Sequence, residues 1–355
     1  MEFGILFTSQ PNLAIDTYPY REVHQRVTGE IQLADRLGYD VAWLAEHHFS
    51  DKYGIIPDVM TYAGYLAGQT KNIKLGTGVV VLPLNNPVRV VENACFVDQL
   101  SGGRFRLGLG SGYRKYEFDG LGVDFDSRRE VQIESLEVLM KLFHEHRIRV
   151  DGKAVRAHID GEFELFPRGP QEPHPPLYMA VGSEQSMTAA ARYGFAIMLS
   201  SLPGTSVLET QTARYRELIS TVESRFAKNP ARGEVLVNRF IHVAETDAEA
   251  RKESEDGVLK HIAHIQSQGN YMTTVDSAVS GARYDDLLGD VLLHGRPDTV
   301  AEGLAELQQR TGMTGVILHY PPHYGPVAIA RSLALFAEEV MPKFRNAKSG
   351  DNAVE

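Results

Sequence analysis

The chain has 355 residues, of which 36 are basic and 46 acidic, giving a formal net charge of −10. This balance argues against a surface for nucleic acid or for an anionic membrane. The single Cys excludes an internal disulfide, and the first residues lack a charged signal region, so we expect a cytoplasmic protein. Its length fits one barrel with insertions.

Apolar periodicity predicts an alternation of short buried strands and amphipathic helices. The predicted strands cover residues 2–9, 41–48, 73–83, 104–110, 176–182, 195–201, 234–243 and 315–320. The predicted helices cover residues 22–38, 59–69, 87–100, 128–146, 184–193, 207–226, 246–265, 297–310 and 326–341. Alternation implies a parallel sheet, and eight strand–helix repeats close naturally into a (β/α)₈ barrel. We therefore expect one α/β barrel domain over residues 1–355.

Three segments break this rhythm. Residues 147–175 are polar and contain Gly and Pro, which suits a hairpin or an excursion from the barrel. Residues 266–292 are long for a structureless loop in a compact barrel, so they predict either a lid or disorder. Residues 343–355 are predicted to form a flexible tail.

An open doubly wound sheet is the competing architecture. A dinucleotide-binding turn is suggested by the closely spaced glycines Gly108, Gly110 and Gly112. The pattern G-x-G-x-x-G, however, needs its third glycine where this chain has Tyr113, and no acidic ribose ligand ends the next strand. The barrel therefore remains the prediction, and the glycines suit a tight strand end as well as a cofactor cradle.

The segment 41–49 is the most informative, because an apolar run of strand length ends there in Glu46, His47 and His48. In a parallel barrel the functional groups gather at the carboxyl ends of the strands. Imidazole titrates near neutrality, which suits acid–base chemistry and hydrogen bonding to an anionic intermediate. An ordinary polar rim is the alternative interpretation of these three residues.

Other strand ends bring further candidates to the same face. Ser111 follows the fourth strand. Ser183 and Ser186 fall at the start of a helix, where free backbone N–H groups and the helix dipole favour an anion. His319 and Tyr320 end the eighth strand and are candidates for the substrate side, although a solvated loop explains them equally well.

Four other histidines have spacings that metal sites use, but no carboxylate or Cys completes a closed set nearby. We predict surface helix positions for them and no metal site; they are His144, His146, His261 and His264. Cys95 has no neighbouring Cys and is predicted to be a buried small apolar residue.

Several motifs in one order resemble the bacterial luciferase-like flavin-dependent monooxygenases. The motifs are 46–49, 75–79 with 82–83, 86–89, 98–101, 103–108, 178–199, 295–298 and 339–342, so the resemblance covers nearly the whole chain. It implies a (β/α)₈ barrel that receives FMN as FMNH₂ from a separate NAD(P)H:flavin reductase. It also implies reaction with O₂ to form a flavin C4a-(hydro)peroxide, which oxygenates a small organic substrate.

The resemblance implies a role for each matching position around the flavin ring. His47 matches the catalytic His beside the flavin C4a atom, and the adjacent Glu46 is assigned to the cofactor site with it. Gly78 and Val79 match the place where a non-proline cis peptide supports the isoalloxazine ring, and Gly110 lies at the neighbouring strand end.

The resemblance also implies a phosphate site, with two departures. Gly182 and Ser183, together with Ser186, match the loop and helix start that hold the flavin phosphate. Arg129, or its neighbour Arg128, matches a phosphate-binding Arg. A second such Arg, after the fourth strand, is replaced here by Ser111, and an acid of the fifth-strand loop is replaced by Gly182, which weakens a residue-by-residue phosphate assignment.

Two other function classes remain open. One is an oxidoreductase that uses the deazaflavin F420 on the same barrel, and the other is a non-catalytic flavin-binding homologue. A homodimer is expected, because small side chains on two helices match the family's dimer face, although packing against the barrel explains them too; they are Ala63, Gly64, Ala67, Gly68, Ala94 and Cys95. Neither the substrate nor light emission follows from the resemblance.

Overall fold

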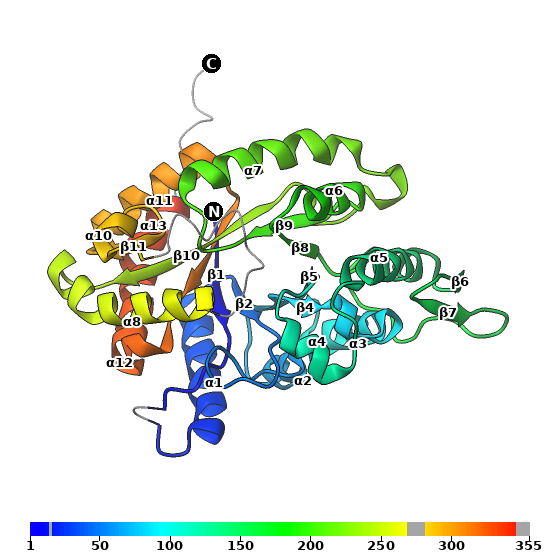
Figure 1. Ribbon diagram of the computed structural model, residues 1–355, viewed down its shortest axis with the longest axis horizontal. Helices are drawn as coiled ribbons and strands as arrows, with labels where there is room; N and C mark the ends of the chain where they lie inside the picture. Colours follow the sequence, from blue (N-terminus) through cyan, green and yellow to red (C-terminus); the bar gives the residue numbers. More distant parts are fainter. Residues whose placement is uncertain (14–15, 268–280, 346–355) are drawn as a thin grey trace.

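The computed structural model describes residues 1–13, 16–267 and 281–345. Its centre is a closed barrel of parallel strands (Figure 1), which confirms the predicted (β/α)₈ architecture. The barrel strands are β1 (Glu2–Phe7), β2 (Val41–Leu44), β3 (Lys74–Thr77), β5 (Phe105–Gly110), β8 (Leu177–Val181), β9 (Ala196–Leu199), β10 (Val235–Val243) and β12 (Gly315–His319). The two-residue strand β4 (Val80–Val81) continues β3 along β5, and β12 pairs with β1 to close the ring.

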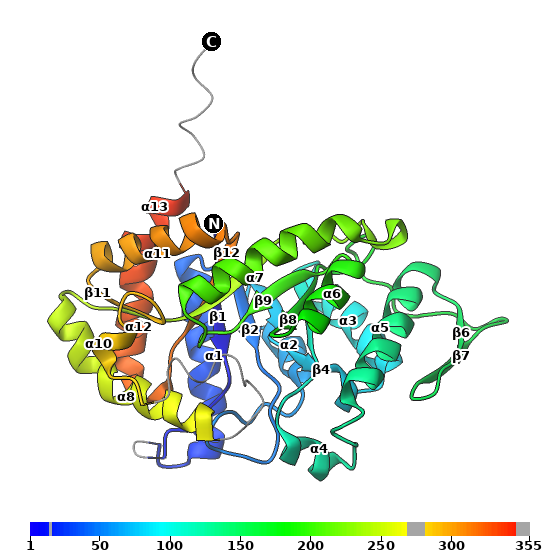
Figure 2. The same ribbon diagram turned by 45° about the horizontal axis from the view of Figure 1, so that its top comes forward.

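Helices surround the barrel on its outside, as Figures 1 and 2 show. The longer helices are α1 (Pro19–Leu37), α2 (Val59–Ala67), α3 (Pro87–Ser101), α5 (Arg128–Glu145), α6 (Glu184–Arg192), α7 (Thr205–Leu218), α8 (Asp247–Ser267), α11 (Pro297–Thr311) and α12 (Pro326–Leu335). Shorter helical segments are η1 (Leu82–Leu84), α4 (Lys115–Leu121), η2 (Ile219–Thr221), η3 (Ser224–Phe226), α10 (Tyr284–Leu287), η4 (Pro322–Tyr324), η5 (Phe336–Val340) and α13 (Met341–Arg345).

Local sequence sets the bounds of α3. Pro87 occupies the first turn, and the side chain of Asn86 accepts hydrogen bonds from the backbone of Val88 at 2.9 Å and of Arg89 at 3.3 Å. The helix ends at Gly102, whose φ of 66° is left-handed and favours glycine. The cap therefore starts α3 shortly after β4 and η1.

The core has two layers. The larger one lies between the strands and the helices and includes Cys95, which is buried as predicted. A smaller cluster fills the barrel interior around Trp43 and Tyr178, whose rings meet edge to face at 5.1 Å. A Cβ on Gly4 would come within 2.6 Å of the Trp43 indole, and one on Gly76 would collide with it, so glycines make room for this ring.

The structure differs from the prediction at β11 (Leu292–Gly295), which we had placed at the end of an irregular stretch. Phe240 of β10 pairs with Leu292 on one side and with His319 on the other. The strand β11 therefore lies on the edge of β10 that β9 pairs with nearer its start. Four residues after an irregular segment give too short a periodic signal to identify such a strand.

The first predicted excursion contains β6 (Ile148–Asp151) and β7 (Arg156–Ile159), an antiparallel hairpin that projects away from the barrel in Figure 2. Residues 268–280, the centre of the predicted lid or disordered stretch, lie outside the described residues. Helix α13 continues to Arg345, three residues into the segment 343–355 that we predicted to be a flexible tail. Residues 346–355 lie outside the described part of the chain.

Candidate active site

His47 lies in the turn that follows β2, at the carboxyl end of the barrel. Its backbone N–H donates to the carbonyl of Ile56 at 3.0 Å, and its side chain is buried. The ring Nδ1 lies 3.1 Å from Oε1 of Glu117, a buried residue in the first turn of α4. The same oxygen accepts the backbone N–H of His48 at 3.1 Å. Glu117 therefore fixes both the turn and the orientation of the imidazole.

The environment of His47 decides its protonation state. Burial lowers the pKa of His47, and the hydrogen bond to Glu117 only partly offsets this effect. The imidazole is therefore neutral at pH 7. We assign its proton to Nδ1, because a carboxylate oxygen accepts hydrogen bonds. This leaves a lone pair on Nε2, so His47 begins as a proton acceptor, whereas the sequence had suggested a hydrogen-bond donor.

Glu46 acts as a clamp between β2 and β4. Its Oε2 accepts the backbone N–H of Val81 at 3.0 Å, and its Oε1 accepts from the side-chain amide of Asn85 at 3.1 Å. The ring Nε2 of His48 lies 3.1 Å from the same Oε1, and this hydrogen bond raises the pKa of His48. Both carboxylate oxygens of Glu46 are thus engaged by protein groups that hold the chain beside His47.

Gly78 and Val79 lie beside this clamp and are joined by a non-proline cis peptide bond. The backbone N–H of Gly78 donates to the carbonyl of Leu44 at 2.6 Å. A Cβ on Gly110 would come within 2.6 Å of Cγ2 of Val79, so this glycine allows the end of β5 to approach Val79 closely. The structure therefore brings Gly78, Val79 and Gly110 together with the His47 turn.

Ser183 and Ser186 open helix α6, as predicted. The Ser183 hydroxyl accepts the backbone N–H of Ser186 at 3.2 Å, which caps the helix. The Ser186 hydroxyl accepts from the backbone of Gly182 at 3.3 Å and of Ser183 at 3.1 Å. Glu184 places a negative charge in the first turn, but its carboxylate pairs with Arg214 at 2.6 Å. The Ser183 hydroxyl is exposed at the start of α6, where the helix dipole favours an anion such as a flavin phosphate.

We expect Ser183→Ala to weaken FMNH₂ binding by about 1–2 kcal/mol, the scale for one hydrogen bond to a charged group. The affinity for riboflavin, which lacks the phosphate, is expected to stay nearly constant. Anaerobic fluorescence titration of the variant with both flavins measures the difference. An equal loss for both ligands would show that the serine only caps α6.

The other residues predicted for the phosphate side follow β5 along the chain. Ser111 is half-buried directly after β5, and Arg129 is exposed in the first turn of α5. The guanidinium of Arg128 lies 3.7 Å over the ring of Phe125 and donates to the Phe125 carbonyl at 2.7 Å. Of the two neighbouring arginines, Arg129 is therefore the one whose side chain extends into solvent.

The two residues predicted for the substrate side point in different directions. His319 is buried at the barrel mouth, stacked on Phe240 at 4.8 Å and 5.0 Å from the ring of His261. His261 is itself buried, so our prediction of a surface position for it was wrong. Tyr320 lies on the opposite face of β12, against α12, so its position does not support a role beside His319.

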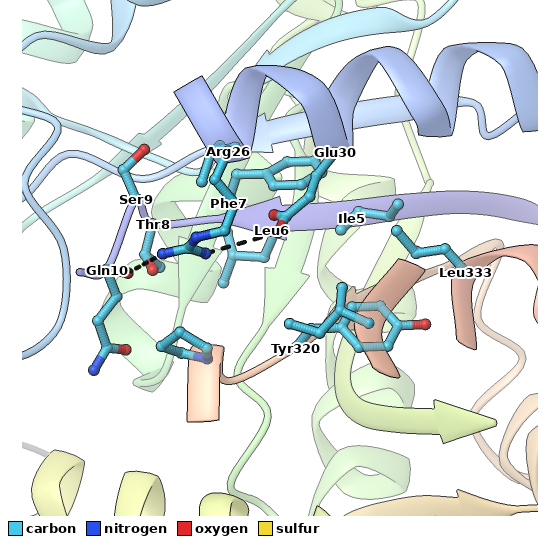
Figure 3. A pocket seen from close by; sticks show the side chains of 13 residues that line it. Ile5, Leu6, Phe7, Thr8, Ser9, Gln10, Arg26, Glu30, Tyr320 and Leu333 are labelled. Carbon is cyan, nitrogen blue, oxygen red and sulfur yellow. Dashed lines mark hydrogen bonds and ion pairs between the residues drawn. The ribbon is translucent and has the colours of Figure 1, made fainter. Parts of the chain in front are cut away.

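Tyr320 lines a small separate cavity between β1, α1 and α12, with a volume of about 30 Å³ (Figure 3). Arg26 crosses this cavity, donating to the carbonyl of Gln10 at 3.2 Å and lying 3.7 Å from Glu30. Burial raises the pKa of Glu30 to about 7. The cavity has room for about one water molecule, and it is too small for a flavin or an organic substrate.

Two features of the site were missed in the sequence. Glu117 belongs to α4, a short helix that we had not predicted, and its contact with His47 joins residues 70 positions apart. The second feature is Arg114, whose guanidinium lies 4.5 Å above the Tyr53 ring. The only local signal was their position after the fourth strand, at the same end of the barrel as His47.

Within the described ranges, no group of three or more His, Cys, Asp or Glu side chains is placed to hold a metal ion. In the part of the chain that the structure describes, no helix is both long and apolar enough to cross a membrane.

Similar folds occur among solved flavin and deazaflavin enzymes. The oxygenating constituent of 3,6-diketocamphane monooxygenase from Pseudomonas putida, in complex with FMN, matches with a TM-score of 0.80 and 24% identity, over 97% of this chain and 98% of that chain. Coenzyme F420-dependent tetrahydromethanopterin reductase from Methanopyrus kandleri matches with a TM-score of 0.69 and 20% identity, over 97% of this chain and 99% of that chain. These likenesses concern the fold.

Sequence relatives lead to a family. The 4-hydroxyprotoasukamycin monooxygenase of Streptomyces nodosus subsp. asukaensis is 27% identical over 339 residues, or 90% of this chain and 86% of that protein. The alkanal monooxygenase alpha chain of Photorhabdus laumondii is 29% identical over 61% of this chain, and the match spans only 59% of its own length. Residues 1–315 match the model of the luciferase-like monooxygenases. The chain therefore belongs to the luciferase-like monooxygenase family.

Proposed function

We propose that this protein is the oxygenating component of a two-component monooxygenase, which takes FMNH₂ from a separate NAD(P)H:flavin reductase and uses O₂ to oxygenate a small organic substrate. The observation that carries the proposal is the His47–Glu117 pair. It holds a neutral, oriented imidazole at the carboxyl end of the barrel, and the preceding residue Glu46 donates its backbone N–H to the carbonyl of Val79 at 3.4 Å. A shared fold alone would not support a particular chemistry.

The residues at the mouth fit FMN by their shape and polarity. The Gly78–Val79 segment and Gly110 would lie against the isoalloxazine ring, since the glycines leave backbone rather than side chains there. Ser183 and Ser186, with the N-terminus of α6, would hold the phosphate. Reduced FMN supplies the electrons that activate O₂. The exposed Arg129 and the half-buried Ser111 would complete the phosphate side.

The protein itself would contribute proton transfer by His47 in a buried environment. Nε2 of His47 accepts a proton from a group bound beside it, and Glu117 then stabilises the resulting imidazolium through the 3.1 Å contact at Nδ1. Burial of both side chains keeps solvent protons away from the reacting atoms. This arrangement favours controlled oxygen transfer over release of hydrogen peroxide.

Anaerobic titration with FMN, FMNH₂ and reduced F420 tests the proposal. We expect FMNH₂ to bind more tightly than FMN and than reduced F420. Tighter binding of reduced F420 would instead identify a hydride-transferring oxidoreductase. Mixing the FMNH₂-loaded protein with oxygenated buffer then tests the third class: tight FMNH₂ binding with the same oxidation rate as free FMNH₂ would identify a non-catalytic flavin-binding homologue.

We further propose a homodimer through the outer surfaces of α2 and α3. The small side chains Ala63, Ala94 and Cys95 pack inward against the barrel, so they do not form this surface. The same helices instead expose three large apolar side chains, Tyr65 (54% exposed), Phe96 (52%) and Leu100 (53%). Apolar side chains gathered in this way are typical of a protein interface.

Light scattering tests the dimer. We expect a dimer for the wild type and a monomer for Phe96→Glu, because a charge at the centre of an apolar interface costs desolvation energy. Val327→Glu is the matched control, since Val327 is 79% exposed on α12, outside the proposed interface. A monomeric wild type, or a Phe96→Glu variant that stays dimeric, would rule out this interface.

A further inference from the structure

Arg114 is a buried cation that has no carboxylate partner among the residues that the structure describes. Its side chain is 1% exposed and lies in the loop between β5 and α4. Among the described residues it forms no ion pair, and its Nε and Nη2 atoms have no hydrogen-bond partner. A buried guanidinium in this state is costly, so such groups are normally paired. The guanidinium is therefore a candidate site for an anionic ligand.

Among the described residues, no acceptor forms a hydrogen bond with Nε or Nη2 of the Arg114 guanidinium. The carbon Cζ lies 4.5 Å from the ring centre of Tyr53 and 5.0 Å from that of Tyr113, so aromatic rings support the group. Its Nη1 contacts the hydroxyl of Tyr116 at 3.4 Å. The two remaining atoms, Nε and Nη2, carry N–H bonds that lie in the guanidinium plane and point outward along the same edge. That edge matches the two oxygens of a carboxylate.

Arg114 lies next to the proposed catalytic residue. The Tyr53 ring that supports Arg114 also contacts the ring of His47 edge to face, with 4.7 Å between ring centres. Tyr53 also stacks with His261, with 5.5 Å between ring centres. The Tyr53 ring therefore contacts the Arg114 guanidinium, the His47 imidazole and the His261 imidazole.

Two further side chains of this region have unused polar atoms. In the described part of the chain, neither ring nitrogen of His261, which is 1% exposed, has a hydrogen-bond partner, and Nδ1 of the neighbouring His319 has none either. Burial lowers the pKa of His319 to about 3 and holds that of His261 well below its ordinary value, so both rings are neutral. A neutral imidazole offers one donor and one acceptor without adding charge.

We propose that the Nε–Nη2 edge of Arg114 binds the carboxylate of an organic-acid substrate, with His261 and His319 beside it as neutral polar contacts. The inference rests on the proposed function, because it names the substrate class of the same site. It adds a substrate-binding role for Arg114, whose side chain holds the acid group while the remainder of the substrate extends toward His47.

Ligand-detected NMR titration of the flavin-free protein tests the proposal. The probes are benzoate, hexanoate and decanoate, each compared with its carboxamide, which has nearly the same shape and no charge. We expect at least one acid to bind about 10- to 100-fold more tightly than its amide, the ratio for charge-assisted hydrogen bonds. Equal binding of acid and amide, or no binding of any acid at millimolar concentration, would overturn the proposal.

Variants of Arg114 locate the effect. Arg114→Met keeps the length of the side chain and is expected to abolish the preference for acids, and Arg114→Lys, which keeps the charge but lacks the two-atom edge, should retain only part of it. Arg149→Met, on the exposed hairpin strand β6, is the control and should bind as the wild type does. A preference that survives in Arg114→Met would contradict the assignment.

A thermal melt of the flavin-free Arg114→Met variant shows whether it folds. We expect no loss of stability, because the substitution removes an unpaired buried charge. If this variant does not fold, Arg114→Lys decides: full retention of the acid preference in that variant would overturn the two-atom assignment.

Flavin titrations separate this proposal from the function on which it rests. We expect Arg114→Met to bind FMNH₂ and riboflavin as the wild type does. A loss of affinity confined to FMNH₂ would assign Arg114 to the flavin phosphate, and a loss of affinity for both FMNH₂ and riboflavin would assign it to the flavin ring. Either result would replace the substrate assignment. Failure of the wild type to bind FMNH₂ would refute the proposed function, while the acid probes would still test Arg114.

Discussion

His47→Ala is expected to bind FMNH₂ with nearly wild-type affinity but to lose control of its reaction with O₂. Without the imidazole no side chain accepts a proton at the position of Nε2, and solvent enters the vacated space. Stopped-flow mixing of the FMNH₂-loaded variant with oxygenated buffer should show faster recovery of oxidised flavin and faster release of hydrogen peroxide. The expected change is about 10²-fold or more, the usual contribution of a positioned acid–base residue.

A second histidine–carboxylate pair provides the control. His158 on β7 lies 2.7 Å from Asp151 on the exposed hairpin, so His158→Ala removes a similar contact outside the barrel mouth. It is expected to leave flavin oxidation unchanged. If His47→Ala oxidised flavin at the wild-type rate and released the wild-type amount of hydrogen peroxide, His47 would have no catalytic role. His48 would then become the candidate.

Glu117→Gln is expected to speed the oxidation of bound FMNH₂ and the release of hydrogen peroxide about 10- to 100-fold. This is the scale for losing a hydrogen bond to a charged group. The carboxylate raises the pKa of His47 against the larger effect of burial, so its removal should lower that pKa further. His47 is active as a base when neutral, and its activity is lost as the pH falls through its pKa. The acidic limb of the pH profile should therefore move to lower pH in Glu117→Gln.

The shift of the acidic limb distinguishes an effect of Glu117 on the charge state of His47 from general support of the turn. Asp151→Asn is the matched control, because it neutralises the partner of His158 on the hairpin. Faster oxidation with an unchanged pH profile would mean that Glu117 supports the turn through the backbone of His48 and not the charge state of His47.

The barrel and the position of His47 were predictable because both depend on local sequence. Strand β2 is buried along its whole length and is therefore a continuous apolar run, and the polar residues that follow it must lie at a strand end. In a parallel barrel all such ends share one face. The helix caps at Asn86 and Ser183 also depend on local sequence, since each cap bonds to residues two to three positions further along the chain.

The residues that complete the site were harder to predict, because they depend on contacts between distant segments. Glu117 contacts His47 from a separate short helix, and no periodic pattern in the sequence predicts that contact. His261 carried a usable signal: with Ala250, Ser254 and Val258 it lies on the buried face of α8, at helical spacing. Side-chain alternation along β12 similarly separates His319 from Tyr320.

A crystal structure of the protein grown anaerobically with reduced FMN tests the central claim most directly. We expect the isoalloxazine ring to lie against the Gly78–Val79 segment, with a flavin atom within about 3.5 Å of Nε2 of His47. The phosphate should contact Ser183 at the N-terminus of α6. A flavin bound elsewhere, or one turned so that His47 contacts neither its ring nor an oxygen position beside it, would contradict the account.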